Sequence, residues 1–294
     1  MPAGFEAQVA AQVHRLSSMP LAEIEREVAA KRTAWFAKHL SVSAFRRLGG
    51  LIAPRVAFEA LFFDYMELSE ADLPVLTESD TEIVWASRNP CPTLEACRRL
   101  GLDTRVVCRG AYEKSAQAFV SLFDPQLRFL RDYEEIRPHA EHCRERIVRV
   151  DFSQMMRLAI QEAEQSRREG NKGYGAVVAL GERILGKAHD TAITGRDPSL
   201  HAEMQAIREA VRAVGRSDLS GGILFSSCEP CPMCASLAVW ANVSTIVFGA
   251  SIEQTAAQGK ARILVPAAEI VARGPALIEV IPGILEAECL ELYS

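Results

Sequence analysis

The sequence predicts an α/β protein of two domains, a mainly helical α+β domain followed by a domain in which strands and helices alternate. The chain has 294 residues, more than the roughly 200 over which one hydrophobic core usually grows. Its hydrophobic pattern also changes, from helix-like spacing in residues 1–148 to short apolar runs between helix-like segments in residues 149–294. Such alternation is typical of a sheet with helices on both faces, which makes a three-layer α/β/α domain.

The first domain, residues 1–148, is expected to consist mostly of packing helices. Apolar residues recur at helical spacing over Leu21–Ala29, and a second amphipathic stretch runs from about Ser43 to Met66. A short strand is expected at Glu82–Ser87. The charged segment Arg137–Arg146 contains a proline and is expected to lead to the domain border.

The second domain opens at Asp151, an acceptable N-cap, and its first helix has one apolar face. Tyr174–Leu180 is a nearly continuous apolar run, as expected of a strand covered on both faces. Trp240 is expected in the core. The other expected elements are a strand after Gly181, a helix from His201 to Gly215, a strand at 223–225, a helix at Cys231–Ala241, a strand at 244–249, a helix from Ser251 and a helix at Ile284–Tyr293.

Composition and charge exclude several classes of protein. The net charge is −5; residues 151–294 hold 13 basic and 17 acidic side chains, a balance of −4, and the remainder hold 20 and 21, a balance of −1. Neither half shows the basic stripe usual in proteins that grip nucleic acid. Apolar runs are shorter than the ~18 residues of a membrane span, and the N-terminus does not resemble a signal peptide. A cytoplasmic protein without a membrane segment is expected.

Eight cysteines in a chain expected in a reducing compartment are more consistent with thiols or metal ligands than with disulfides. Two short segments are the most informative, His201-Ala202-Glu203 and Pro230-Cys231-Pro232-Met233-Cys234. Together they spell H-x-E followed by P-C-x-x-C, the signature of zinc-dependent deaminases of bases.

Each residue type in these segments has a chemical reason to be there. Cys231 and Cys234 lie three apart at a helix start, so both sulfurs face one side and can bind a single zinc ion at ~2.3 Å. The positive end of the helix dipole favours the thiolates that zinc requires. With neutral His201 they make three protein ligands and leave a fourth position open, as in catalytic rather than structural zinc sites.

Glu203 is the expected catalytic residue. Zinc lowers the pKa of a bound water to about 7, and a nearby carboxylate can accept its proton, protonate the ring nitrogen beside the reacting carbon and pass a proton to the leaving ammonia. On an ideal helix His201 and Glu203 point ~200° apart, so they are expected to converge only at the mouth of the helix.

Two alternatives arise from the residues alone. The first is a structural zinc site with Cys228 as the fourth ligand, although Cys228 follows an expected strand and is interpreted as a packed thiol. The second is a ligand-sensing protein whose zinc domain is inert. Glu203 and the open ligand position favour an enzyme.

Around these residues the chain resembles the cytidine deaminase-like superfamily, in the branch that contains guanine deaminases and tRNA adenosine deaminases. The likeness covers nearly all of 151–294 and is carried by GYGAVVALGERILGKAHD, DPSLHAEMQAI, SSCEPCPMC, STIVFGASI and PGILEAECLELY. It implies a mixed five-stranded sheet between helices, a homodimer, a Zn²⁺ cofactor and hydrolytic deamination of a nucleobase-like or nucleoside-like ring. A guanine-like purine or cytosine-like ring is the leading substrate. Adenosine in tRNA is the alternative, which the −4 balance disfavours.

The resemblance also implies that the substrate ring lies between the first hairpin and the zinc. The candidate contacts are Tyr174, Ala176, Val177, Asp190, Ala202 and Tyr293. A core role for Tyr293 remains an equal alternative.

Asp190 is a departure from the family pattern. Eleven residues before the zinc histidine this branch has an Asn that holds the polar edge of the ring, whereas this chain has Asp190. Asn donates and accepts hydrogen bonds, while ionised Asp only accepts. The change predicts preference for a ring with an N–H or second amine on that edge. In the alternative, Asp190 is a turn or solvated residue. His189 beside it is interpreted as a strand-end surface residue rather than a ligand.

The first domain has no assigned role. The spacings of Cys91, Cys97, Cys108 and Cys143 match no pattern typical of zinc or iron–sulfur sites. Buried thiols are expected there, and a metal or substrate-thiol site is the alternative. An arginine cluster is either a solvated face or a site for an anionic ligand; its members are Arg98, Arg99, Arg105, Arg109 and Arg137.

Overall fold

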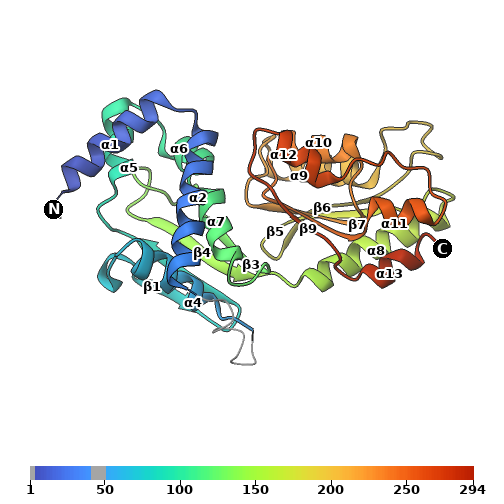
Figure 1. Ribbon diagram of the computed structural model, residues 1–294, viewed down its shortest axis with the longest axis horizontal. Coiled ribbons are helices and arrows are strands. Elements are labelled where there is room, and N and C mark those ends of the chain that lie inside the picture. Colours follow the sequence, from blue (N-terminus) through green and yellow to red (C-terminus); the bar gives the residue numbers. More distant parts are fainter. Residues whose placement is uncertain (1–3, 41–50) are drawn as a thin grey trace. The chain divides into compact units, whose positions relative to one another are not determined.

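The structure, a computed structural model, describes residues 4–40 and 51–294 (Figure 1). It divides into two compact units, Met1–Val150 and Asp151–Ser294. The part of the expected amphipathic stretch that precedes residue 51 lies outside the described residues. In the described part of the chain, no helix is long and apolar enough to cross a membrane.

The first unit packs helices against a four-stranded antiparallel sheet in the order β1-β2-β4-β3. The strands are β1 (Val75–Glu78), β2 (Glu82–Ser87), β3 (Leu127–Arg131) and β4 (Cys143–Arg149). The helices are α1 (Phe5–Ser18), α2 (Leu21–His39), α4 (Pro54–Glu59), the π-helical turn η1 (Ala60–Tyr65), the short η2 (Glu70–Asp72), α5 (Pro92–Leu100), α6 (Thr104–Ala111) and α7 (Glu113–Ser121). One face of the sheet packs against α2, α4, η1 and α7 through a cluster that includes Trp85, Phe129 and Ile147.

Strand β4 is absent from the sequence-based expectation. Residues 137–146, predicted as the approach to a domain border, contain the start of β4, which is an inner strand paired on both sides. The sequence CRERIVR hides this strand because charged residues interrupt the apolar alternation that identifies a half-buried strand. Strand β2, by contrast, has the expected bounds.

The second unit contains a mixed five-stranded sheet in the order β6-β5-β7-β8-β9. β5 is antiparallel to both β6 and β7, while β7, β8 and β9 are parallel. The strands are β5 (Gly175–Leu180), β6 (Arg183–His189), β7 (Gly222–Cys228), β8 (Thr245–Ala250) and β9 (Glu279–Ile281). The helices are α8 (Phe152–Arg168), α9 (Ala202–Val214), α10 (Pro232–Trp240), α11 (Ile252–Ala257), α12 (Ala267–Arg273) and α13 (Glu286–Glu291).

Helices cover both faces of this sheet, so the predicted three-layer α/β/α architecture is confirmed. α9, α10 and α12 lie on one face, and α8 and α13 lie on the other (Figure 1). Two glycines permit α8 and α9 to pack closely against the strands of the sheet, α8 on β5 and α9 on β6. A Cβ on Gly175 would lie 2.0 Å from the Ala159 carbonyl oxygen of α8, and one on Gly186 would lie 2.2 Å from the Ala206 carbonyl oxygen of α9.

Most expected elements of the second unit are present, with two omissions and one error. Asp151 caps α8, accepting from the Gln154 N–H at 2.9 Å, and Gly215 ends α9 in the left-handed conformation (φ 68°). The short strand β9 and helix α12 are absent from the sequence-based expectation. Trp240 is expected in the core but is 76% exposed, because it is the last residue of α10 and follows the buried Ala238 and Val239.

Candidate metal centre

The candidate centre lies where α9 and α10 begin, beside the central strand β7. Cys231 is the N-cap of α10, and Pro232 follows in the first turn. Proline is tolerated there because the backbone N–H that it lacks would have no intrahelical acceptor. His201 is the N-cap of α9 and has an extended backbone (φ −71°, ψ 153°). Because His201 precedes the first helical residue, the ~200° separation of an ideal helix does not apply to it, and its ring lies at the mouth of the helix.

Three potential ligand atoms converge at this point. His201 Nδ1 lies 3.6 Å from Cys231 Sγ and 3.5 Å from Cys234 Sγ, and the two sulfurs are 3.6 Å apart. Within residues 4–40 and 51–294 these side chains form the one group of three or more His, Cys, Asp or Glu residues able to hold a metal ion. One nitrogen and two sulfurs are the donor set that zinc prefers, so the residues fit that ion.

The local electrostatics favour a thiolate at this centre. A hydrogen bond from the Cys234 thiol, followed by the influence of His201, lowers the pKa of Cys231 to about 4 against an opposing effect of burial. The first-turn N–H groups of α10 add partial positive charge at the same place. Cys231 therefore presents a charged sulfur at neutral pH, which is the form that binds metal.

Glu203 lies in the first turn of α9 and is only 6% exposed. Burial raises the pKa of its carboxyl group, and the charge on Cys231 raises it further, while His201 opposes this effect. The Ser226 hydroxyl, near the end of β7, donates to Glu203 Oε1 at 3.3 Å. A buried carboxyl group with a raised pKa, beside a metal-binding group, is suited to accepting and donating protons.

Cys228 does not join the ligand group in the described chain. Its sulfur lies 3.7 Å from Thr255 Oγ1 and accepts from Arg262 Nη2 at 3.3 Å. Burial raises its pKa to about 11. The fourth-ligand alternative therefore gains no support, and Cys228 is a packed thiol at the end of β7.

Asp190 follows β6 and its side chain is fully buried. Oδ1 accepts from the Ala192 N–H at 3.2 Å, and the Asp190 N–H donates to the Tyr174 carbonyl oxygen at 2.9 Å. Oδ2 has no hydrogen-bond partner among the residues that the structure describes. Asp190 is thus a turn residue through Oδ1 but not a solvated one, and its second oxygen is available to a bound molecule.

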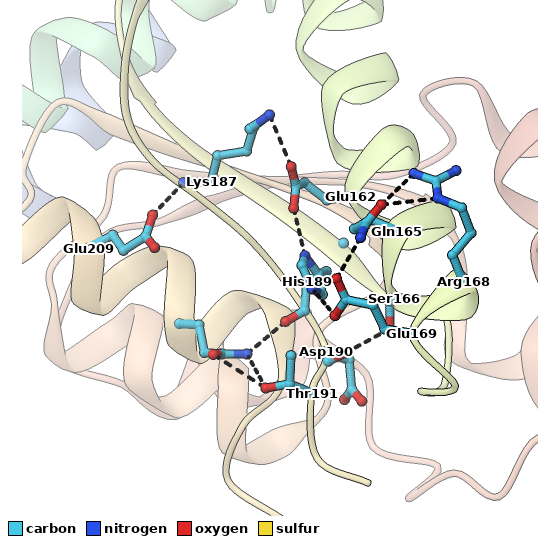
Figure 2. Close-up of polar contacts among 12 residues, drawn as sticks. Glu162, Gln165, Ser166, Arg168, Glu169, Lys187, His189, Asp190, Thr191 and Glu209 are labelled. Carbon is cyan, nitrogen blue, oxygen red and sulfur yellow. Dashed lines mark hydrogen bonds and ion pairs between the residues drawn. The ribbon is translucent and has the colours of Figure 1, made fainter. Parts of the chain in front are cut away.

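A polar network fixes the strand end that carries Asp190 (Figure 2). The His189 ring lies between two carboxylates, with Nδ1 2.8 Å from Glu162 and Nε2 2.9 Å from Glu169. Ser166 donates to the Asp190 carbonyl oxygen at 2.7 Å. Figure 2 shows the Asp190 carboxylate pointing away from the His189 ring. His189 therefore holds the strand to α8 rather than contacting the ligand group.

The structure brings together some of the other predicted contacts and separates the rest. Ala176 and Ala202 are buried in the same apolar cluster, on the face covered by α9. Val177 is next to Ala176 in β5, so its side chain points to the opposite face. Tyr293 is 1% exposed, with its hydroxyl 2.9 Å from Ser227 Oγ and its ring centroid 5.1 Å from that of Tyr174, which is a core position.

Two polar residues near the centre are not evident from the sequence. Ser226 contacts Glu203. The Arg262 guanidinium lies 5.3 Å from the Tyr174 ring centroid, donates to the Glu229 carbonyl oxygen at 2.9 Å, and lowers the pKa of Glu203. Neither belongs to a recognisable motif, although the SSC segment that ends β7 marks an unusually polar end for a buried strand.

Several known proteins are similar to the part of the chain that holds this centre. A family model described as the cytidine and deoxycytidylate deaminase zinc-binding region matches residues 150–250. The tRNA-specific adenosine deaminase of Bacillus subtilis is 35% identical over 139 residues, which are 47% of this chain and 84% of that protein. The guanine deaminase of Bacillus subtilis is 36% identical over 86 residues, 29% of this chain and 55% of that protein.

Solved structures of two deaminases are also similar to this chain. A tRNA:A34 deaminase matches with 26% identity and a TM-score of 0.43, covering 48% of this chain and 99% of that one. Guanine deaminase from Nitrosomonas europaea matches with 22% identity and a TM-score of 0.43, covering 48% of this chain and 81% of that one.

Proposed function

The chain belongs to the cytidine deaminase-like superfamily and is a zinc-dependent deaminase, and from that premise we propose that its second unit hydrolyses an exocyclic amine of a nucleobase-like ring. The net reaction exchanges a C–NH₂ group and water for a C=O group and ammonia. The observation that carries this proposal is the group of His201, Cys231 and Cys234, with buried Glu203 two positions after the histidine.

His201 Nδ1 and the sulfurs of Cys231 and Cys234 are the proposed zinc ligands. Bound there, zinc would polarise a water molecule and lower its pKa to about 7. Three ligands from the protein leave a coordination position for that water, which distinguishes a catalytic site from a closed structural one.

Glu203 is the proposed proton carrier. Its carboxylate accepts a proton from the attacking water and gives it to the ring nitrogen beside the reacting carbon. It then accepts the proton of the newly added hydroxyl group, which becomes the C=O oxygen, and gives that proton to the departing amine. Burial and the Ser226 hydroxyl hold the carboxylate in one place during these transfers. Its raised pKa brings it closer to the pH at which proton transfer in both directions is efficient.

Asp190 is the proposed contact to the polar edge of the ring. A buried carboxylate oxygen without a partner among the described residues favours a ligand that donates a hydrogen bond. A ring with an N–H or an amine on that edge meets this requirement, as a guanine-like purine does. Tyr174, Ala176 and Ala202 are proposed to contact the rest of the ring.

A second candidate function is deamination of adenosine in tRNA. It is favoured by the likeness to the Bacillus subtilis tRNA-specific adenosine deaminase, of which the match covers 84%. The −4 balance of residues 151–294 favours the small-molecule substrate, because a tRNA stem is bound through several neutralised phosphates. Assembly as a homodimer and a location in the cytoplasm stay predictions.

The two functions are separated by measuring ammonia release from the zinc-loaded full chain. The substrates are a panel of free bases, the corresponding nucleosides and an unmodified tRNA, each also incubated with a Glu203→Gln variant. The proposal expects turnover of at least one free ring compound and little turnover of tRNA. Turnover of tRNA alone establishes the second candidate instead. Ammonia release from none of the substrates by a fully zinc-occupied chain contradicts both and favours the inert, ligand-sensing alternative.

A further inference from the structure

A second set of buried polar groups lies in the first unit, on the helix-covered face of its sheet. Arg131 at the end of β3 is paired in register with Glu145 of β4, and Glu145 is paired with Trp85 of β2. All three side chains lie on the face that packs against the helices. Arg32 lies in α2, is only 8% exposed, and bonds Ser115 of α7, the helix that packs against β3.

Glu145 is fully engaged by its own neighbours. Oε1 accepts from Arg131, at 2.8 Å from Nε and 2.5 Å from Nη2. Oε2 accepts from the Trp85 indole N–H at 3.2 Å and from the Ser87 hydroxyl at 2.5 Å. The residue is 3% exposed. Both carboxylate oxygens are therefore occupied, and Glu145 has little capacity for a second arginine.

Two guanidinium groups in this region keep unused donors. Arg131 Nη1 is buried and has no hydrogen-bond partner among the residues that the structure describes, and the same holds for Arg32 Nε. Arg32 makes one bond, from Nη1 to the Ser115 hydroxyl at 2.8 Å, and its Cζ lies 5.9 Å from the Tyr65 ring centroid. Buried arginine donors are normally paired, so these need an explanation.

Arg32 forms no ion pair among the residues that the structure describes. Burial is the main cause that lowers the pKa of Arg32 to about 10; Arg131 lowers it further, and Glu145 raises it. Arg131 and Glu145 are thus both close enough to Arg32 to change its pKa. Glu145, which raises the pKa of Arg32, is already bonded to Arg131 through Oε1, and an unpaired buried cation is costly.

We propose that the first unit binds the carboxylate or phosphate group of a small molecule between Arg32 and Arg131. The forked donors of arginine match the geometry of these two anions, and bidentate contacts to them are strong. An anion in this position would supply the missing acceptor for Arg131 Nη1 and Arg32 Nε and would balance the second positive charge. This proposal is independent of the deaminase reaction assigned to the second unit.

The neighbouring thiol indicates binding rather than nucleophilic chemistry. The charge of Arg131 lowers the pKa of Cys108, but burial has the larger effect and raises that pKa to about 12. The thiol is therefore neutral at physiological pH. Part of the arginine cluster expected from the sequence lies on a solvated face instead. Arg99 and Arg105, for example, are exposed and paired with acidic neighbours, Glu6 and Asp103.

The test uses the zinc-loaded full chain and two probes, inorganic phosphate and acetate, at constant ionic strength against chloride. Unfolding is followed by tryptophan fluorescence, since two of the three tryptophans, Trp35 and Trp85, lie in the first unit. The expected result is a saturable rise in the unfolding temperature, about 3–6 °C at ten times the Kd. A response to phosphate alone identifies a phosphate ligand, and a response to acetate alone identifies a carboxylate.

Variants distinguish a ligand site from a structural pair. Arg32→Met removes the unbalanced charge, so it is expected to abolish the anion response without lowering the unfolding temperature in the absence of anions. Arg131→Lys keeps a cation beside Glu145 but loses Nη1, and it is expected to weaken anion binding at least tenfold. Arg99→Met, on the surface, is the control and is expected to respond like the wild type. No response from the wild type to either anion, or an unchanged response in both site variants, overturns the proposal.

Discussion

Each unit carries a Pro-Cys-Pro segment between the end of a strand and the first turn of a helix. In the first unit it is Pro90-Cys91-Pro92, between β2 and α5; in the second it is Pro230-Cys231-Pro232, between β7 and α10. The cysteine is the N-cap in both places, and both backbones there are extended. The two segments are therefore alike in sequence, in neighbouring elements and in position on the helix.

The two thiols nevertheless differ in chemistry. Cys91 Sγ turns back to its own helix and accepts from the Leu94 N–H at 3.4 Å, and burial raises its pKa. Cys231 makes no such cap; its sulfur faces Cys234 and His201, and its pKa is lowered to about 4. A helix N-terminus is common to both, so the dipole alone does not make a metal ligand. Cys231 differs in having a second thiol at the third helical position and the His201 imidazole beside it, which together make it a candidate ligand.

The largest expected effect tests the difference between Cys231 and Cys91 directly. Cys231→Ser and Cys91→Ser are matched changes, because serine is a good N-cap and preserves the start of either helix. Cys231→Ser is expected to reduce zinc from about one ion per chain to nearly none and to abolish ammonia release. Cys91→Ser is expected to leave both unchanged. Metal analysis of the purified proteins measures the outcome, and equal zinc in both variants contradicts the assignment of Cys231 as a ligand.

A smaller effect, on substrate preference, is expected at Asp190. Asp190→Asn adds a donor to the edge that the proposal matches to a ring N–H. The ratio of kcat/KM between a ring with a donor at that edge and a ring without one is expected to fall about 10–100-fold. Asp197→Asn, in the following loop, is the control. An unchanged ratio in Asp190→Asn assigns that residue to the turn alone.

The network around His189 predicts a modest dependence of stability on pH. Burial by itself lowers the pKa of His189, but hydrogen bonds to Glu162 and Glu169 raise it above its ordinary value near 6.5. Stability from a raised pKa is fully present below the unfolded pKa and is lost as pH rises through the folded one. The unfolding free energy of the wild type relative to His189→Gln is therefore expected to be larger at pH 5.5 than at pH 8.5, by about 0.5–1 kcal/mol after solvent screening.

Chemical denaturation at the two pH values measures this difference. His14→Gln, at an exposed position of the first unit, is the control and is expected to show no such change. A difference that grows with rising pH would have the wrong sign and would mean that the two carboxylates do not hold the ring as the structure shows.

The last change is expected to have no effect, and it tests whether the spacing of the cysteines alone is sufficient for zinc binding. Leu94→Cys gives the first unit the same P-C-P-x-C spacing as the second. Because the Cys91 sulfur caps its own helix and the described part of that unit holds no group of three potential ligands, zinc is expected to remain at about one ion per chain. A second tightly bound zinc would show that the spacing alone is sufficient.

The sequence indicates the site residues that belong to short motifs, but not those that only folding brings together. The proposed ligands and Glu203 belong to short motifs whose chemistry requires those residues, so the sequence alone indicates them. Ser226 and Arg262 could not be identified in this way, because their proximity to Glu203 depends on strand pairing and on the path of a distant loop. Val177 is expected beside the ring, but the alternation of β5 directs it to the other face.

The same reasoning applies to the fold. The alternation of apolar runs and helices predicts the three layers of the second unit, and the resemblance predicts its mixed sheet of five strands. The first unit is harder to predict, because β4 carries charges on both faces and because β1 and β3 have only 4 and 5 residues. Arg32 and Glu145 lie 113 positions apart in the chain, and only the folded sheet and helix bring them together.

The most direct test of the central claim is a paired measurement on Glu203→Gln, with zinc content and ammonia release determined on the same sample. Glu209→Gln, further along α9, is the matched control. The account predicts full zinc occupancy in both variants, turnover lowered by ~10²–10⁴ in Glu203→Gln, and normal turnover in Glu209→Gln. Undiminished ammonia release from a zinc-loaded Glu203→Gln protein would contradict the account.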